Sequence, residues 1–138
     1  MVQELRQARI LAMQALSQWE AQREENSECL TELFASRHAS SKAGKLAGDW
    51  VRSFWSERDS IDRRLQSASS RWALERMATV DRNVMRVAVI ELTHCSTPPA
   101  VILDEAIEIA REYGGTESPR FVNGVLDQVL RTIQEETG

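Results

Sequence analysis

"SPRFVNGVLDQVLRTI" is the sequence of residues 118–133, and it contains two conflicting structural signals. Asn-Gly between apolar residues is the strongest short signal for a β-hairpin. The apolar residues around it do not alternate but recur at helical spacing, at Phe121, Val122, Val125, Leu126, Val129, Leu130 and Ile133. Pro119 also suits the first turn of a helix, where its missing N–H had no partner. We therefore predict a helix with Asn123 and Gly124 in its interior, although glycine there costs about 1 kcal/mol relative to alanine.

Helical patterns extend back from this segment through almost the whole chain. "AVILDEAIEIAREY" is preceded by Pro99 and followed by Gly114-Gly115, which are start and stop signals for a helix. The segment over 78–95 is apolar on most of its circumference, which predicts a central, buried helix. We expect an all-α protein with about seven helices, over residues 3–22, 29–35, 45–58, 58–69, 78–95, 99–113 and 118–133, and a loop over 36–44.

Length and composition predict a single globular domain over residues 1–138. The chain has 138 residues, of which 42% are apolar and 28% are charged. No apolar run is long enough to span a membrane, and the start of the chain lacks the features of a secretory signal, so we expect a cytoplasmic protein. A net charge of −4 argues against a strongly electrostatic nucleic-acid binder. RNA binding would require a local basic patch or help from a partner.

The sequence offers no convincing catalytic, metal or cofactor site. Glu91-x-x-His94 is half of a di-iron motif, which needs a second such pair, and the only other histidine, His38, has no acid three positions before it. We interpret Glu91 as a helix-surface or hydrogen-bonded structural acid. The acids on one face of the helix over 99–113 are expected to be solvated: Glu105, Glu108 and Glu112. We predict a protein that is not an enzyme and binds no cofactor.

Tryptophan and arginine are the remaining candidates for a binding surface. The tryptophans fall mostly on apolar stripes and are expected in the core: Trp19, Trp50, Trp55 and Trp72. The arginines are scattered along the chain, and each taken alone is expected to be solvated: Arg6, Arg9, Arg63, Arg64, Arg71, Arg76, Arg82, Arg86 and Arg120. A case for RNA binding therefore depends on several of them meeting in space.

The second half of the chain closely resembles the NusB family of bacterial transcription antitermination factors. The stretches that carry the resemblance are "VDRNVMRVAVIEL", "VILDEAIEIAREYG" and "FVNGVLD", in that order, and "RQARILAMQAL" fits the opening helix of the family. The resemblance implies an all-α fold of two small helical sub-bundles. It also implies binding to the boxA element of ribosomal-operon RNA together with NusE, a small-subunit ribosomal protein, and recruitment to the RNA polymerase antitermination complex, without catalysis.

The resemblance also implies which residues contact each partner. The RNA surface would be formed by the N-terminal helix and the start of the last helix, with Arg6, Arg9, Gln14, Arg76, Arg120, Phe121 and Asn123. The partner-protein surface would be acidic, with Glu75, Asp81 and Glu117, and Glu117 would border both surfaces. Gly124 would allow close approach either of a ligand or of a neighbouring helix.

This chain departs from the family pattern at its N-terminus. Other members have a run of basic residues before the first helix, whereas this chain begins with "MVQEL" and has Gln7 near its two arginines. Ser17 stands where many members have tyrosine. Since each lost phosphate contact weakens RNA binding, we expect low intrinsic affinity and a greater need for a basic partner.

Two other functions remain open at this point. NusB-like domains also precede ribosomal RNA cytosine methyltransferase domains, where they dock the substrate. This sequence ends at Gly138 after an acidic tail with no methyltransferase domain, which favours the antitermination adaptor. The third alternative is a structural helical protein, which could be a homodimer, that has lost RNA binding.

Overall fold

The computed structural model describes residues 2–137, and these form six α-helices, one 3-10 turn and no strand. The helices are α1 (Val2–Gln22), α2 (Ser27–Ser36), α3 (Ser41–Ala68), α4 (Thr79–His94), α5 (Pro99–Tyr113) and α6 (Ser118–Thr137), and the 3-10 turn η1 covers Leu74–Arg76. The prediction of an all-α fold is confirmed. Within residues 2–137, no helix is both long and apolar enough to cross a membrane.

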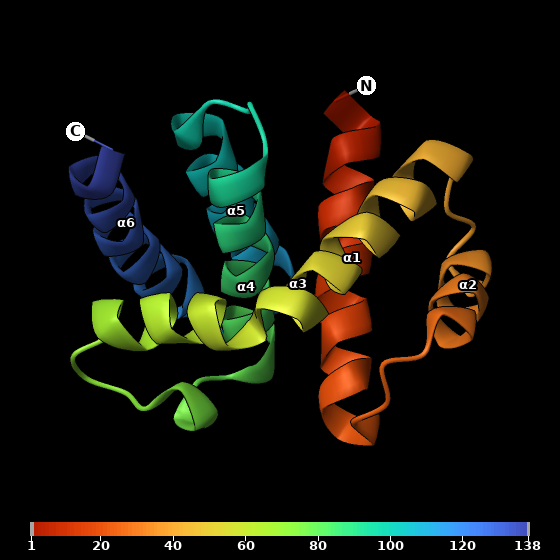
Figure 1. Cartoon of the computed structure of the whole chain (residues 1–138), viewed down its shortest axis with the longest axis horizontal. Helices are drawn as coiled ribbons and strands as arrows, with labels where there is room; N and C mark the ends of the chain where they lie inside the picture. Colours follow the sequence, from red (N-terminus) through yellow and green to blue (C-terminus); the bar gives the residue numbers. More distant parts are fainter. Residues whose placement is uncertain (1, 138) are drawn as a thin grey trace.

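The helices form two groups that share α3. In Figure 1, α1, α2 and the first half of α3 lie on one side, while α4, α5 and α6 lie on the other. The long helix α3 packs on α1, α2, α4 and α6, so it joins the two groups. The arrangement confirms the prediction of two small helical sub-bundles.

Helix α4 lies at the centre of the molecule, as its apolar circumference predicted. Every residue from Asn83 to Glu91 is buried, and α4 packs on α1, α3, α5 and α6. Because α4 contacts both groups of helices, the buried apolar residues form one continuous core. Burial of about 25 cal/mol per Å² of apolar surface is the main force that holds these helices together.

The first half of the chain differs from the prediction at two places. The helices expected over 45–58 and 58–69 are one helix, α3, with a break at Glu57, whose φ of −115° and ψ of 18° are not helical. The break therefore lies at the predicted boundary. The loop expected over 36–44 is shorter, because Ser40 Oγ accepts a hydrogen bond from Ala43 N at 3.1 Å and starts α3 at Ser41.

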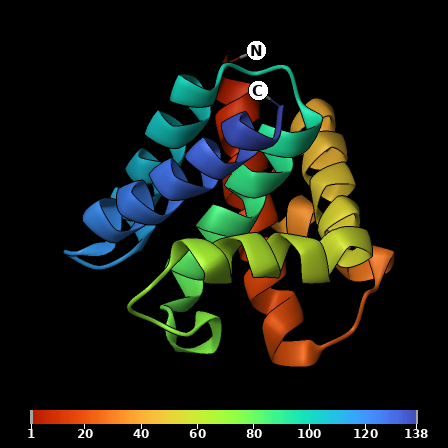
Figure 2. The same cartoon turned by 60° about the vertical axis from the view of Figure 1, so that its left-hand side comes forward.

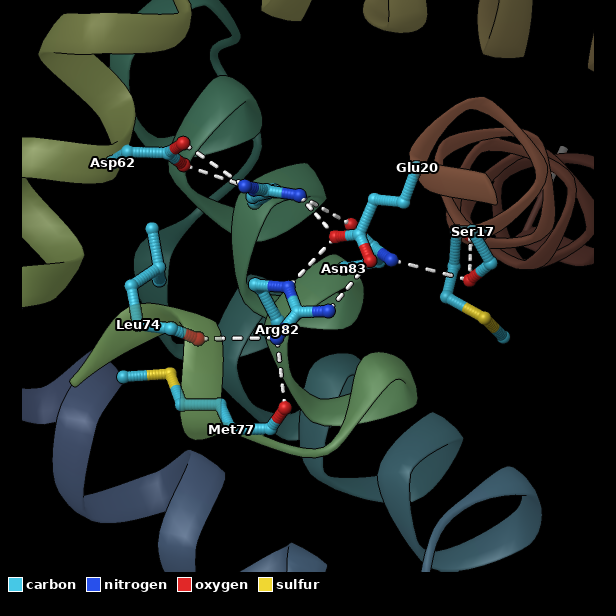
Figure 3. Close-up of polar contacts among 9 residues, drawn as sticks. Ser17, Glu20, Asp62, Leu74, Met77, Arg82 and Asn83 are labelled. Atoms are coloured by element: carbon cyan, nitrogen blue, oxygen red, sulfur yellow. Dashed lines mark hydrogen bonds and ion pairs between the residues drawn. The ribbon is translucent and has the colours of Figure 1, made fainter. Parts of the chain in front are cut away.

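A network of charged side chains joins α1, α3 and α4 inside the protein. Figure 3 shows Glu20 of α1 between the guanidinium groups of α4. Arg82 Nε donates to Glu20 Oε1 at 2.7 Å, and Arg86, which also donates to Glu20, makes two bonds of 2.9 Å to Asp62 of α3. Arg82 and Arg86 were predicted to be solvated, and the structure corrects this because their acidic partners come from other helices.

The same network extends to Ser17 and to the turn η1. Asn83 is fully buried; it accepts a bond from Arg86 at 3.0 Å and donates to Ser17 Oγ at 3.2 Å. Arg82 also donates to the backbone carbonyls of Leu74 and Met77, at 3.1 and 2.7 Å (Figure 3). The ion pairs that join the helices therefore also fix the segment between α3 and α4.

Glu20→Gln is expected to lower the free energy of unfolding at pH 7 by about 3 kcal/mol, because two largely buried guanidinium groups lose their shared counter-charge. Burial alone would raise the pKa of Glu20, but the hydrogen bonds and charges of Arg82 and Arg86 outweigh it and lower the pKa below 4.5. The carboxylate thus contributes stability above about pH 4.5 that is lost as the pH falls through the lower folded-state pKa.

Urea unfolding of the wild type and the variant between pH 7 and pH 3 tests this expectation. The difference between the two should narrow as the pH falls from about 4.5 through the lower pKa of folded Glu20, where the wild type becomes protonated as well. Glu24→Gln is the control, since this glutamate is exposed in the segment after α1 and should leave stability unchanged. Equal stability of Glu20→Gln and wild type at pH 7 would contradict the role of the network.

Candidate nucleic-acid interface

Arg9, predicted to contact RNA, lies inside the protein. Its side chain is 5% exposed, and its Nε and Nη2 donate to Glu91 of α4 at 2.6 and 2.9 Å. Its Nη1 donates to Glu105 of α5 at 3.0 Å. In this arrangement Arg9 cannot reach a ligand, so we correct its role to joining α1 with α4 and α5. Glu91 is 1% exposed and is the structural acid that was predicted.

Arg6 lies one turn earlier on α1 and remains partly exposed. It forms an ion pair with Glu105, whose side chain is 13% exposed, so Glu105 is not the solvated acid that was predicted. The hydrogen bond and charge of Arg6, with the charge of Arg9, outweigh burial and lower the pKa of Glu105. A phosphate at Arg6 would therefore have to compete with a carboxylate that is already bound.

Arg9→Ala is expected to destabilise the protein by about 3–5 kcal/mol, because it leaves the buried carboxylate of Glu91 without its counter-charge. Arg6→Ala should cost less than about 1 kcal/mol, because its ion pair is partly exposed. Chemical unfolding monitored by circular dichroism measures both. If the two variants had equal stability, the buried pair would not hold α1 in place.

Trp72 is a residue that sequence reasoning placed in the core but the structure places on the surface. It is 50% exposed, whereas Trp19 and Trp50 are 3% and 5% exposed, as predicted. Trp72 lies between α3 and η1, outside any helix, so helical spacing carries no information about its burial. Its position in the serine-rich stretch "SASSRW" is the sequence signal that could have identified it.

Two grooves meet at Trp72 and the start of α6. The first, which we call the α6 groove, has a volume of about 530 Å³ and is lined by Arg71, Trp72, Arg120, Phe121 and Gly124, among others. Figure 2 shows the segment around η1 on the same side of the molecule as the turn between α5 and α6. Arg120 and Phe121, which were predicted to contact RNA, therefore line the same groove as Arg71 and Trp72. The latter two were not predicted as site residues.

The second groove, which we call the α4 groove, shares Trp72 and Phe121 with the first. It has a volume of about 490 Å³ and is lined by Arg76, Asp81 and Glu117 together with the two aromatic rings. Glu117 lines both grooves. The structure therefore brings together Arg76, Asp81 and Glu117, which come from η1, the first turn of α4 and the turn before α6.

Asp81 has an unusual environment for a carboxylate. It is 7% exposed, and its Oδ1 is buried without a hydrogen-bond partner among residues 2–137. Its place in the first turn of α4 is favourable to a negative charge, because the N–H end of a helix is positive. A buried acceptor without a partner nevertheless costs about 1–3 kcal/mol. Asp81 therefore contributes negative charge to the wall of the α4 groove, while its Oδ1 itself is covered.

The other predicted site residues lie outside the two grooves. Asn123 is exposed on α6, next to Gly124, and Glu75 is exposed on η1. Gln14 is half-buried on α1, which packs mainly on α3 and α4. Arg6 and Gln14 are therefore placed on a different helix from the residues gathered around the start of α6.

Gly124 faces open space on α6. A Cβ atom built at this position meets no atom within 4 Å, so the alternative in which Gly124 lets two helices pack closely is wrong. The same residue lines the α6 groove. Of the two roles considered for this glycine, close approach of a ligand is the one that the geometry supports.

Gly124→Ala is expected to stabilise the protein by about 0.5–1 kcal/mol, because alanine is the better helix former and its methyl group meets no neighbour. Thermal and urea unfolding measure the change. A matched control is Gly114→Ala at the end of α5, where a Cβ would lie 2.7 Å from the carbonyl of Ala110 and should destabilise. Destabilisation by Gly124→Ala would show that this glycine has a structural role after all.

The fold and the two adjoining grooves define a small all-helical protein built for binding. The family model described as "NusB family" matches residues 6–131. The transcription antitermination protein NusB of Solibacter usitatus is 36% identical over 132 residues, which are 94% of this chain and 90% of that protein. The chain therefore belongs to the NusB family.

Solved structures agree with this assignment. NusB of T. maritima superposes with a TM-score of 0.79 at 35% identity, over 91% of this chain and 89% of that one. A chain from the crystal structure of the antitermination factors NusB and NusE in complex with dsRNA superposes with a TM-score of 0.85 over 96% of this chain and 99% of that one. Its identity is 23%, so this second likeness supports the fold.

Proposed function

We propose that this chain is a transcription antitermination adaptor that binds boxA-type RNA together with NusE and is recruited to RNA polymerase. Membership of the NusB family supports the class of function, since relatives over almost the full length are named transcription antitermination proteins. The adaptor works in the cytoplasm, where it holds two partners together without catalysing a reaction.

The observation that carries this proposal is the pair of adjoining grooves with opposite charge. The α6 groove is lined by two arginines, Arg71 and Arg120, and one acid, Glu117, whereas the α4 groove is lined by two acids, Asp81 and Glu117, and one arginine, Arg76. Complementary charge steers association and selects the partner. RNA therefore fits the first groove and the start of α6, and a basic protein such as NusE fits the second.

Asp81 gives the partner groove a specific contact. Its carboxylate lines the α4 groove, where its negative charge can attract a lysine or arginine of NusE. Glu75 on the exposed surface of η1 extends the acidic surface. For RNA, we retain Arg6, Gln14, Arg76, Arg120, Phe121 and Asn123 as contacts, without Arg9.

Fluorescence anisotropy of a labelled boxA-type RNA, with the chain alone and with NusE, tests the proposal over a salt series. We expect binding that prefers boxA to a scrambled RNA and that tightens when NusE is added. Arg120→Ala should lower the slope of log K against log salt by about 0.7, the value for one phosphate contact to a single strand. No preference for boxA in either condition, from a folded sample, would refute RNA recognition.

Asp81→Asn separates the partner surface from the RNA surface. We expect this variant to lose the tightening by NusE and to keep the RNA affinity of the free chain, because the substitution removes charge from the α4 groove only. Asp104→Asn, an exposed acid on α5, is the matched control. If Asp81→Asn responded to NusE like the wild type, the α4 groove would not be the partner site.

A further inference from the structure

Trp72 is the most exposed aromatic side chain among the described residues. Half of its surface is accessible, so it lies outside the buried core. A large exposed apolar side chain at the edge of a groove is a common mark of a binding surface. The proposed function accounts for its neighbours Arg120 and Phe121 but leaves Trp72 without a role.

The backbone of Trp72 is held in place although its ring is exposed. Its carbonyl accepts hydrogen bonds from Ser69 Oγ at 3.1 Å and from Gln66 Nε2 at 3.2 Å, and its N–H donates to Ser69 Oγ at 3.4 Å. Gln66 Oε1 also accepts a bond of 2.8 Å from Leu74 N. Two side chains near the end of α3 thus fix the turn, so little backbone freedom is lost when a ligand meets the ring.

The arginines beside Trp72 differ from most others in the protein. Arg71 and Arg120 are exposed and form no ion pair or side-chain hydrogen bond among the described residues. Arg64 and Arg131, which also belong to α3 and α6, are paired with Glu136 and Asp127. Two of the unpaired arginines near Trp72, Arg71 and Arg120, therefore line the α6 groove, and a third, Arg76, lines the α4 groove.

An exposed aromatic ring beside unpaired arginines is the combination that binds single-stranded nucleic acid. The arginines attract the phosphates, and a base stacks on the ring whatever its identity, because every base has a π-face. Single-stranded RNA is preferred to a duplex by such a surface, since only unpaired bases can leave the strand to stack. Gly124 adds no side chain to the lining of this groove.

We propose that Trp72 is a base-stacking platform for single-stranded RNA, with Arg71 and Arg120 as phosphate contacts in the same α6 groove. The inference rests on the proposed RNA-binding function and adds to it a stacking site on the loop between α3 and η1. Stacking supplies affinity without base selection, which compensates for the sparse basic residues of the N-terminus. The α4 groove remains available to the protein partner.

Trp72→Ala is expected to weaken binding of the boxA-type RNA on the order of tenfold, the size of one lost base–aromatic stack. The salt slope should stay unchanged, because no charge is removed. A strand of the same length with ribose and phosphate but no bases should bind wild type and Trp72→Ala equally. Arg71→Ala should show the opposite pattern, with weaker binding of both strands and a salt slope lowered by about 0.7.

Two further variants complete the measurement, which is made by anisotropy with NusE present. Trp72→Phe should recover much of the affinity, because a smaller ring still stacks. Tyr113→Ala removes an aromatic ring that is 40% exposed outside both grooves, and it should bind like the wild type. Thermal unfolding checks that Trp72→Ala is folded. If this variant does not fold, the fluorescence of Trp72 is measured instead, as the difference between wild type and Trp72→Phe. Quenching of this fluorescence by RNA is then the expected result, and no quenching would overturn the stacking platform.

The outcomes separate this inference from the function on which it rests. If Trp72→Ala binds RNA as tightly as the wild type, and the wild type still prefers boxA, only the stacking platform is overturned. Wild type that binds no RNA overturns both. If Trp72→Ala loses NusE and keeps the RNA affinity of the free chain, the ring contacts the protein partner, and the stacking platform is again overturned.

Discussion

The ion pairs of Glu20 with Arg82 and Arg86 are the interaction on which the rest of this structure depends. Charges taken out of water are costly unless every donor and acceptor is satisfied. Here Arg86 also binds Asp62, and the remaining donors of Arg82 bind backbone carbonyls, so the cost is offset. These directional bonds fix the relative positions of α1, α3 and α4, because apolar packing alone is not directional.

This interior network also determines where the binding surface lies. Arg82 holds the carbonyls of Leu74 and Met77, while Gln66 and Ser69 hold the backbone of Trp72 just before them. The segment between α3 and α4 is therefore anchored at both ends, although it contains only a single 3-10 turn. Its position beside α6 creates the two grooves, so the surface chemistry depends on arginine pairing inside the protein.

The sequence predicted the helices well and the pairing of charges poorly, for a physical reason. The apolar period of α4, α5 and α6 is local information, and each of these helices was predicted within a few residues. The partner of Arg9 lies 82 positions away and that of Arg82 lies 62 away, so no local pattern reveals that these arginines are buried. Trp72 lies outside a periodic segment, where spacing cannot indicate which way a ring points.

Unpaired arginines beside Trp72 allow an acidic chain to present local positive charge. Arg9, Arg82 and Arg86 are neutralised by carboxylates, and the unpaired arginines beside Trp72 are Arg71 and Arg120 in the α6 groove and Arg76 in the α4 groove. The acidic α4 groove adjoins the α6 groove through Glu117. Under the proposed function, a basic protein seated there would offset the repulsion of Asp81 and Glu117 on nearby phosphates. Because coupling between two binding sites is reciprocal, RNA would then strengthen partner binding by the same factor.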